Sequence, residues 1–165
     1  MLINHWPTRF TVVTNRFGAD PASYRRFGLP GHEGLDFRVR YRAFISPIYA
    51  CTAGTIKFVG YRSSGDPYGY QVRIATQYEG ANYEFVYAHL TNGSCELSVG
   101  HVVQPGTKIG LGGATGNAYG AHLHVSIKRA NATATKQTSF PYDLLDPEPF
   151  FREYIRVMGL EVEWK

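Results

Sequence analysis

Residues 121–129 read AHLHVSIKR, and polar and apolar side chains alternate through the first half of this stretch. Alternation with a period of two indicates a half-buried β-strand, because successive side chains of a strand point to opposite faces of its sheet. In such a strand Leu123 and Val125 pack into the core, and His122 and His124 share the opposite face. The sequence therefore predicts a strand that holds two imidazoles side by side.

Outward from this strand, the chain alternates between short apolar segments and turns rich in Gly, Pro, Asn and Ser. Four further segments are predicted to be strands: residues 46–51, 55–61, 69–78 and 83–90. We expect residues 52–54 to join the first two as a hairpin and residues 79–82 to join the last two. Residues 102–110 contain a Pro-Gly turn between two short apolar pieces, and residues 1–31 are expected to be irregular. Connections this short favour antiparallel pairing, since parallel strands need long crossovers.

The composition also favours a β-rich fold. The 165 residues are 44% hydrophobic and 15% aromatic, with 18 Gly and 9 Pro. Aromatic residues suit a pleated surface and Gly and Pro favour turns, which argues against a helical bundle. The dipeptide Asp146-Pro147 before an apolar-periodic run predicts one helix at about 147–158. We expect an all-β protein with antiparallel sheets, little helix and a short C-terminal helix.

A second motif supplies further candidate metal ligands. Residues 31–37 read GHEGLDF and place His32 four residues before Asp36. Two His and one carboxylate form the ligand set of a class of catalytic zinc sites, which keep a fourth position for water. The H-E-x-x-H helix of other metalloproteases is not present, because position 36 holds Asp where that motif needs His. The alternative for Asp36 is an ordinary ion pair with Arg38 or Arg40.

Two other stretches lie between these motifs. Residues 87–90, YAHL, end a predicted strand and place His89 where it can overhang a site. Residues 112–117, GGATGN, are rich in glycine but lack the Lys and the helix start of a phosphate-binding loop. We interpret them as a loop that lets the backbone approach a ligand or makes a tight turn.

Taken in order, GHEGLDF, YAHL and the stretch TGNAYGAHLH at residues 115–124 resemble the lysostaphin/LytM-type zinc metallopeptidases, which cleave bacterial peptidoglycan. The resemblance runs from about Arg16 to Phe150. It implies the lysostaphin-like fold, known as the duplicated hybrid motif. It also implies one metallopeptidase domain over residues 1–165, with a catalytic core at about 16–150 and a helical tail at about 147–165.

The resemblance also implies roles for individual residues. By position, His32, Asp36 and His124 match the zinc ligands, with one Zn²⁺ per chain, and His122 and His89 match the catalytic pair beside the reacting water and the substrate carbonyl. Imidazole, with a pKa near 6.5, can accept a proton at neutral pH, and the sequence leaves open which of the two is the general base. The dipeptide Val125-Ser126 stands where the family commonly has an aromatic and an acidic residue.

The implied function is zinc-dependent hydrolysis of peptide bonds in the stem peptide or cross-bridge of bacterial peptidoglycan. The expected partners are a peptidoglycan peptide and, given the net charge of +4, anionic cell-wall polymers. We expect a monomer with no nucleic-acid partner and no membrane span, because no apolar run reaches about 18 residues. The implied location is extracellular, periplasmic or wall-associated, for a bacterial or phage-encoded protein. Residues 1–10 lack the layout of a signal peptide, so export is handled otherwise or a leader or upstream domain is missing.

Three alternatives remain at this point. The first is a non-catalytic LytM-like binding or activator domain, and the second is a cysteine-type cell-wall peptidase that uses Cys51 or Cys95 with His89. These cysteines form one bridge or stay as two free thiols. The third is a nucleic-acid-binding β-barrel, which leaves the ordered His and Asp motifs as coincidence. The predicted groove walls are loops 18–31, 62–69, 91–101 and 111–120, with Tyr68, Asn117 and Tyr119 as candidate substrate contacts.

Overall fold

The computed structural model describes residues 1–129 and 144–165. The predicted catalytic core includes residues 130–143, which lie outside the described residues. The strands are β1 (Val12–Asn15), β2 (Leu35–Arg38), β3 (Arg40–Tyr41), β4 (Phe44–Ile45), β5 (Pro47–Tyr49), β6 (Gly54–Gly60), β7 (Tyr70–Tyr78), β8 (Ala81–Leu90), β9 (Val102–Val103), β10 (Lys108–Leu111), β11 (His122–Arg129), β12 (Leu144–Leu145) and β13 (Glu163–Trp164). The helices are α1 (Pro21–Tyr24), a 3₁₀ turn at Arg25–Phe27, and α2 (Glu148–Met158). The chain is therefore mostly β, with a short C-terminal helix as predicted.

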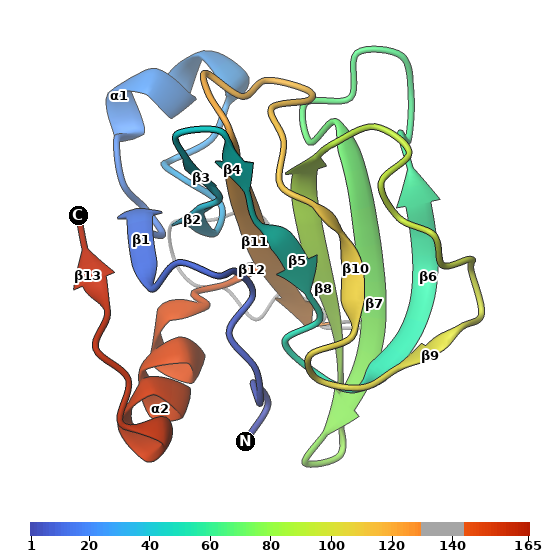
Figure 1. Cartoon of the computed structure of the whole chain (residues 1–165). Coiled ribbons are helices and arrows are strands. Elements are labelled where there is room, and N and C mark those ends of the chain that lie inside the picture. Colours follow the sequence, from blue (N-terminus) through green and yellow to red (C-terminus); the bar gives the residue numbers. More distant parts are fainter. Residues whose placement is uncertain (130–143) are drawn as a thin grey trace.

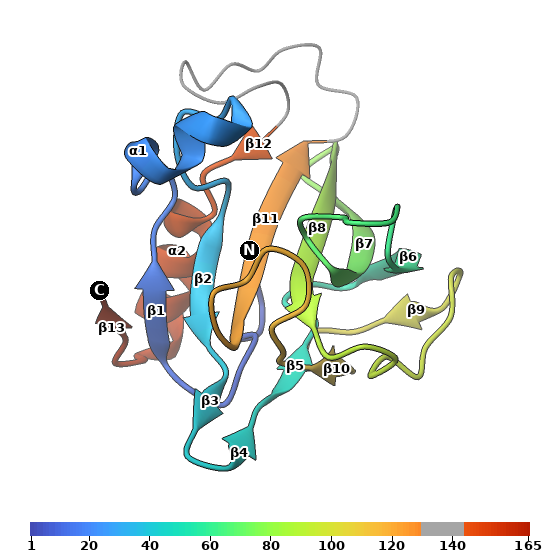
Figure 2. The same cartoon turned by 90° about the horizontal axis from the view of Figure 1, so that it is seen from above.

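One large sheet forms the centre of the molecule (Figures 1 and 2). Its strands run in the order β13-β1-β2-β11-β8-β7-β6-β9, and β12 adds a short pairing to β11. Every neighbouring pair in this order is antiparallel except β1 and β13, which are parallel. The predicted strand at 121–129 corresponds to β11, which lies between β2 and β8.

The predicted hairpin across residues 52–54 is wrong. Strand β5 pairs with β10, and β6 pairs with β7 and β9, so the chain changes sheets at this point. A two-residue hairpin needs a positive φ at both central residues or a glycine at the first. Glu79 (φ 48°) and Gly80 (φ 75°) meet that need between β7 and β8, as predicted, whereas residues 52–54 have no positive φ.

The N-terminal segment is more regular than expected. Strand β1 pairs with β2 on one side and with β13 on the other, and Val13 is fully buried. A four-residue strand leaves too short a pattern to recognise, and its pairing partners come from distant parts of the sequence. The expectation of an irregular segment over residues 1–31 is therefore wrong for residues 12–15, and also for residues 21–27, which form α1 and the 3₁₀ turn.

The predicted helix at 147–158 is confirmed as α2. Its first turn is held by Asp146, whose Oδ1 accepts a hydrogen bond from the backbone N–H of Glu148 at 2.9 Å. Phe151 packs edge-on against Trp6, and its ring also contacts Phe37 of β2. Helix α2 thereby covers one face of the sheet beside β1 and β2 (Figure 2).

The two faces of the sheet have different contents. Leu35 and Phe37 of β2 and Leu123 and Val125 of β11 are fully buried in the core, on the face that α2 covers. Because side chains alternate along a strand, the residues between them point to the opposite face. That opposite face carries the polar residues described below. Within the described residues, none of the helices has the length and apolar character needed to cross a bilayer.

Candidate metal centre

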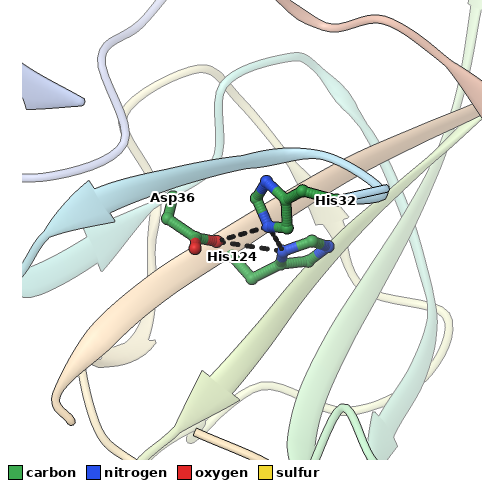
Figure 3. A group of neighbouring side chains, drawn as sticks. All are labelled: His32, Asp36 and His124. Atoms are coloured by element: carbon green, nitrogen blue, oxygen red, sulfur yellow. Dashed lines mark hydrogen bonds and ion pairs between the residues drawn. The ribbon is translucent and has the colours of Figure 1, made fainter. Parts of the chain in front are cut away.

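Three buried side chains converge on one point above the sheet (Figure 3). His32 Nε2 lies 2.9 Å from His124 Nδ1 and 3.0 Å from Asp36 Oδ1, and His124 Nδ1 lies 3.0 Å from the same oxygen. The three residues come from the segment before β2, from β2 and from β11. The expected ligand set is therefore brought together in space, and neither Arg38 nor Arg40 forms the alternative ion pair with Asp36 among the described residues.

In His32 and His124, the ring nitrogen that points away from Asp36 forms a hydrogen bond, and this bond shows whether the nitrogen that faces Asp36 carries a lone pair. His32 Nδ1 lies 3.0 Å from the carbonyl oxygen of Arg16, which can only accept, so Nδ1 carries the hydrogen and Nε2 keeps a lone pair. His124 Nε2 lies 2.7 Å from Ser126 Oγ, which leaves Nδ1 directed at Asp36. Two imidazole lone pairs and a carboxylate oxygen within 3.0 Å of one another favour a cation between them.

The spacing of these atoms fits a small divalent ion. Zinc ligands about 2.0–2.1 Å from a tetrahedral ion lie roughly 3.3 Å apart, slightly more than the separations found here. Burial opposes ionisation of Asp36, but the neighbouring imidazoles of His124 and His32 outweigh it and hold the pKa of Asp36 far below its usual range. The carboxylate is therefore charged, and with the two imidazoles it forms a nitrogen- and oxygen-donor set suited to zinc.

Strand register explains why Asp36 and His124 meet. The two residues are directly paired across β2 and β11, so their side chains leave the sheet on the same face. Gly34 lets the preceding segment approach β11, since a Cβ at this position would lie 2.2 Å from the carbonyl oxygen of Val125 and 3.0 Å from Cε1 of His124. The second glycine of GHEGLDF, Gly34, is therefore a packing requirement of the metal centre.

His122 lies beside the three ligands, on the same face of β11. Its Nδ1 lies 2.8 Å from the carbonyl oxygen of Gly120, which can only accept, so Nδ1 carries a hydrogen. Its Nε2 lies 3.8 Å from Asp36 Oδ1, and 22% of the side chain is exposed. His122 thus offers an accepting nitrogen at the border between the metal centre and solvent.

His89 reaches the same place from the end of β8 through a β-bulge. Phe85 and Tyr87 face the core, so simple alternation would direct His89 there too. The register between β7 and β8 shifts at this point, and His89 adopts a φ of 62°, in the left-handed region. Bulges of this kind re-aim side chains near functional sites. Here the bulge brings the His89 ring to within 4.7 Å of the His122 ring and 5.9 Å of the His124 ring, centre to centre.

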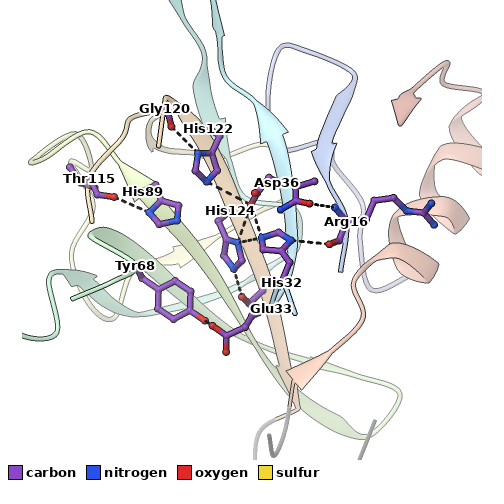
Figure 4. Close-up of polar contacts among 12 residues, drawn as sticks. Arg16, His32, Glu33, Asp36, Tyr68, His89, Thr115, Gly120, His122 and His124 are labelled. Atoms are coloured by element: carbon purple, nitrogen blue, oxygen red, sulfur yellow. Dashed lines mark hydrogen bonds and ion pairs between the residues drawn. The ribbon is translucent and has the colours of Figure 1, made fainter. Parts of the chain in front are cut away.

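The protonation of His89 is also defined by its surroundings. Its Nδ1 lies 2.8 Å from the carbonyl oxygen of Thr115 and donates to it, which leaves Nε2 free to accept a proton (Figure 4). Burial, with the neighbouring His124 and His122, lowers the pKa of His89 to about 3. His89 and His122 therefore have the same arrangement, each with Nδ1 fixed on a backbone carbonyl and Nε2 available.

The structure adds contacts that the sequence did not indicate. Carbonyl groups of Arg16, Thr115 and Gly120 orient three of the four imidazoles, and backbone atoms leave no signal in residue identity. Ser126 orients the fourth, and its position two residues after His124 on the same strand face was an available signal.

The three candidate substrate contacts differ in their surroundings. Tyr68 is half-buried, and its hydroxyl donates to Glu33 Oε2 at 3.0 Å. Tyr119 is 92% exposed and contacts Arg26, and the backbone N–H of Asn117 donates to the carbonyl of Pro67. A role in binding substrate stays a prediction for all three.

Both cysteines, which the structure describes, are free thiols. Cys51 is fully buried, and burial raises the pKa of its thiol to about 12. Burial also raises the pKa of Cys95, whose Sγ contacts the carbonyl of Leu97. A reactive cysteine needs a lowered pKa and access to substrate, so this geometry does not support cysteine chemistry.

Comparison with known sequences decides the family. The sequence model of peptidase family M23 matches residues 30–137, well over half of the chain. The chain belongs to peptidase family M23. The matched range contains all five predicted site residues of this M23 chain.

Individual relatives agree with this assignment. An uncharacterized metalloprotease of Haemophilus influenzae is 33% identical over 93 residues, which are 56% of this chain and only 18% of the relative. The catalytic domain of the antimicrobial peptidase lysostaphin from Staphylococcus simulans is similar in structure, with a TM-score of 0.61 and 24% identity over 85% of this chain and 91% of that one. A zinc containing peptidase from Vibrio cholerae gives a TM-score of 0.59 and 24% identity over 88% of this M23 chain and 39% of its own. At these identities the two structures establish a shared, lysostaphin-like fold.

Proposed function

We propose that the protein is a zinc-dependent endopeptidase that hydrolyses peptide bonds in bacterial peptidoglycan. The observation that carries the proposal is the convergence of His32, Asp36 and His124, with two further imidazoles directed at the same place. Membership of family M23 supports peptide hydrolysis, and the fold shared with the peptidase lysostaphin supports a cell-wall substrate. A structural neighbour described as zinc containing supports the identity of the metal.

The chemistry divides between the metal and the two unligated imidazoles. Zinc, when bound by the three ligands, supplies Lewis acidity toward water and the scissile carbonyl. His89 and His122 each present an unprotonated Nε2, so either can take the proton of the attacking water and return it to the leaving amine. The second imidazole, when its Nε2 has taken up a proton from solvent, donates a hydrogen bond to the negative charge that develops on the carbonyl oxygen. Proton acceptance requires a free Nε2, and the carbonyls of Thr115 and Gly120 place the ring hydrogen of each imidazole on Nδ1.

The remaining expectations belong to the same proposal. We place the protein outside the cytoplasm or at the cell wall, as a monomer whose residues 1–165 form one domain. A net charge of +4 supports attraction to anionic wall polymers. The intact set of five site residues favours an active enzyme over a non-catalytic relative of the same fold.

Digestion of purified peptidoglycan sacculi tests the proposal. We expect the zinc-loaded protein to release soluble wall peptides, with masses that identify the cleaved bond as a glycine bridge or a D-amino-acid cross-link. A chelator should abolish the release and added zinc should restore it, while a thiol-blocking reagent should have no effect. Release that survives chelation but stops with the thiol reagent would contradict the metal mechanism, and no release from any sacculus type would contradict the substrate.

A further inference from the structure

A buried carboxylate outside the metal centre holds the loop between β6 and β7 in shape. Asp66 lies in this loop and is 6% exposed. Its Oδ1 accepts a hydrogen bond from the backbone N–H of Tyr68 at 3.0 Å. Its Oδ2 accepts from the backbone N–H of Arg62 at 2.9 Å and from Gln71 Nε2 at 2.7 Å. One side chain therefore fixes both ends of the loop over residues 62–68.

Gln71 connects this carboxylate to the central sheet. Arg73 Nε donates to Gln71 Oε1 at 2.8 Å, which leaves the amide nitrogen of Gln71 to donate to Asp66. Arg73 also donates to Glu84 Oε1 at 2.9 Å, so the contacts run from β8 through β7 to the loop. Gln71 is fully buried and Arg73 is 7% exposed, and hydrogen bonds in such a low-dielectric interior are stronger than in water. The loop is thus tied to the middle of the sheet by a buried polar network.

The same loop meets the backbone of His89. The carbonyl oxygen of Tyr68 accepts a hydrogen bond from the backbone N–H of His89 at 2.9 Å. His89 has a φ of 62°, and this bond uses its N–H where the regular pairing of β7 and β8 is interrupted. Only Tyr68 therefore separates the carboxylate of Asp66 from the backbone of His89.

The loop also meets the segment that orients the His89 ring. The carbonyl of Thr115 accepts from His89 Nδ1, and Figure 4 shows Thr115 and Tyr68 beside His89. The carbonyl of Pro67 accepts from the backbone N–H of Asn117 at 2.9 Å, which joins the two loops. Both the backbone and the ring of His89 thus depend on where residues 66–68 lie.

We infer that Asp66 is a positioning residue that acts through the backbone of Tyr68 to hold His89 in its bulge, with the imidazole turned toward His122 and His124. Its effect on catalysis rests on the proposed function, in which His89 is one of the two imidazoles that handle the proton. None of the hydrogen bonds that Asp66 forms among the described residues reaches a metal ligand. Loss of Asp66 should therefore leave metal binding intact.

Hydrogen exchange, followed by NMR on the full chain, tests the positioning directly. We expect the backbone amide of His89 to exchange at least about tenfold faster in Asp66→Ala, because its acceptor is no longer held, while amides in the middle of β8 exchange as before. Thr107→Val is the matched control, since Thr107 Oγ1 fixes a different turn by accepting from the backbone N–H of Gln104 at 3.0 Å. Asp66→Asn leaves one acceptor oxygen for three donors and gives the same test, with a smaller effect, if Asp66→Ala does not fold.

Kinetics separate this role from a general loss of stability. Asp66→Ala should retain one zinc per chain and lower kcat for wall-peptide release by about 10- to 100-fold, with little change in KM, because a displaced catalytic group slows the reaction without weakening substrate binding. In a His89→Ala background the same change should lower kcat by less than about twofold, since the residue that Asp66 positions is already absent.

Two results would overturn the inference. One is equal exchange at the His89 amide in Asp66→Ala and in the Thr107→Val control, and the other is a loss of kcat that is equally large in the His89→Ala background. Failure of the unaltered protein to release wall peptides would instead contradict the proposed function, and the exchange measurement would still decide whether Asp66 positions His89.

Discussion

At the scale of single residues, His89 is the clearest sign that this face of the sheet serves a function. Its left-handed backbone conformation costs of the order of 1–3 kcal/mol for a residue with a side chain. The conformation belongs to the bulge that turns the imidazole from the core toward His122 and His124. Such strain is found where the surrounding structure holds a residue in place for a function. Here the imidazole of His89 is the fourth at this site.

His89 and His122 should be needed for turnover and not for metal binding. We expect His89→Ala and His122→Ala each to retain one zinc per chain and to lose about 10²- to 10⁴-fold in the rate of wall-peptide release. Zinc content by elemental analysis and initial rates measure the two effects separately. His101→Ala, at an exposed histidine outside the site, is the control. Near-normal turnover in either variant would remove that residue from the proposed mechanism.

Gly34 should tolerate no side chain. A Cβ at this position would press on the backbone of Val125 and on the His124 ring, so we expect Gly34→Ala to lower the free energy of unfolding by about 1–3 kcal/mol and to weaken zinc binding. Gly120→Ala is the control, since its Cβ would meet no atom within 4 Å. Urea denaturation of the metal-free proteins measures the difference, and equal stability of the two variants would contradict the packing described here.

At the scale of elements, α2 is tied to the metal centre through one charged cluster. Glu148 at its start accepts hydrogen bonds from Arg16 at 2.8 and 2.9 Å and from Arg152 at 2.7 Å. The carbonyl of Arg16 in turn orients His32. The C-terminal helix therefore stabilises the segment that holds one of the ligands.

This cluster should make stability depend on pH. Burial opposes ionisation of Glu148, but its hydrogen bonds with Arg16 and Arg152 outweigh it and lower the pKa of Glu148. A lowered folded-state pKa stabilises the protein at pH values above the ordinary Glu pKa, near 4.3, and this contribution is lost as pH falls through the folded-state value. We expect Glu148→Gln to cost about 1–2 kcal/mol at pH 7 and much less near pH 3.

Urea denaturation at both pH values measures this effect. Glu153→Gln, at an exposed position of the same helix, is the control and should show no such pH dependence. A Glu148→Gln penalty that is as large near pH 3 as at pH 7 would show that the ion cluster is not its source.

The elements differ in how far the sequence predicts them. Strands β7, β8 and β11 and helix α2 were predictable, because each has a long periodic pattern bounded by turn or cap residues. Strands β1, β12 and β13 have two to four residues each and exist through pairing with distant segments, which local patterns do not encode. The pairing of β5 with β10 and of β6 with β9 was missed for the same reason, since β9 and β10 are short strands that lie far along the chain from β5 and β6.

At the scale of the whole molecule, the site is assembled from segments spread over most of the chain. The residue types and spacing predicted the ligand set and the two further imidazoles. The direction in which His89 points, and the ring nitrogens that His32 and His124 turn toward Asp36, depend on the packed fold. These features follow from backbone register and carbonyl positions, which residue identity does not reveal.

Metal binding should stabilise the whole fold. A ligand that binds only the folded state adds about 2.7 kcal/mol at a free concentration one hundred times its Kd. We therefore expect zinc to raise the Tm of the metal-stripped protein and a chelator to lower it again, as measured by differential scanning calorimetry. In an Asp36→Asn, His124→Ala double variant the Tm should not respond to zinc. A zinc-dependent Tm in that variant would indicate binding elsewhere.

The central claim is that His32, Asp36 and His124 together hold one zinc ion. The most direct measurement is an anomalous difference map at the zinc absorption edge, from crystals grown with zinc. The account predicts a single strong peak for each chain, coordinated by His32 Nε2, His124 Nδ1 and an Asp36 carboxylate oxygen. A peak at another set of residues, or none at these three, would contradict it.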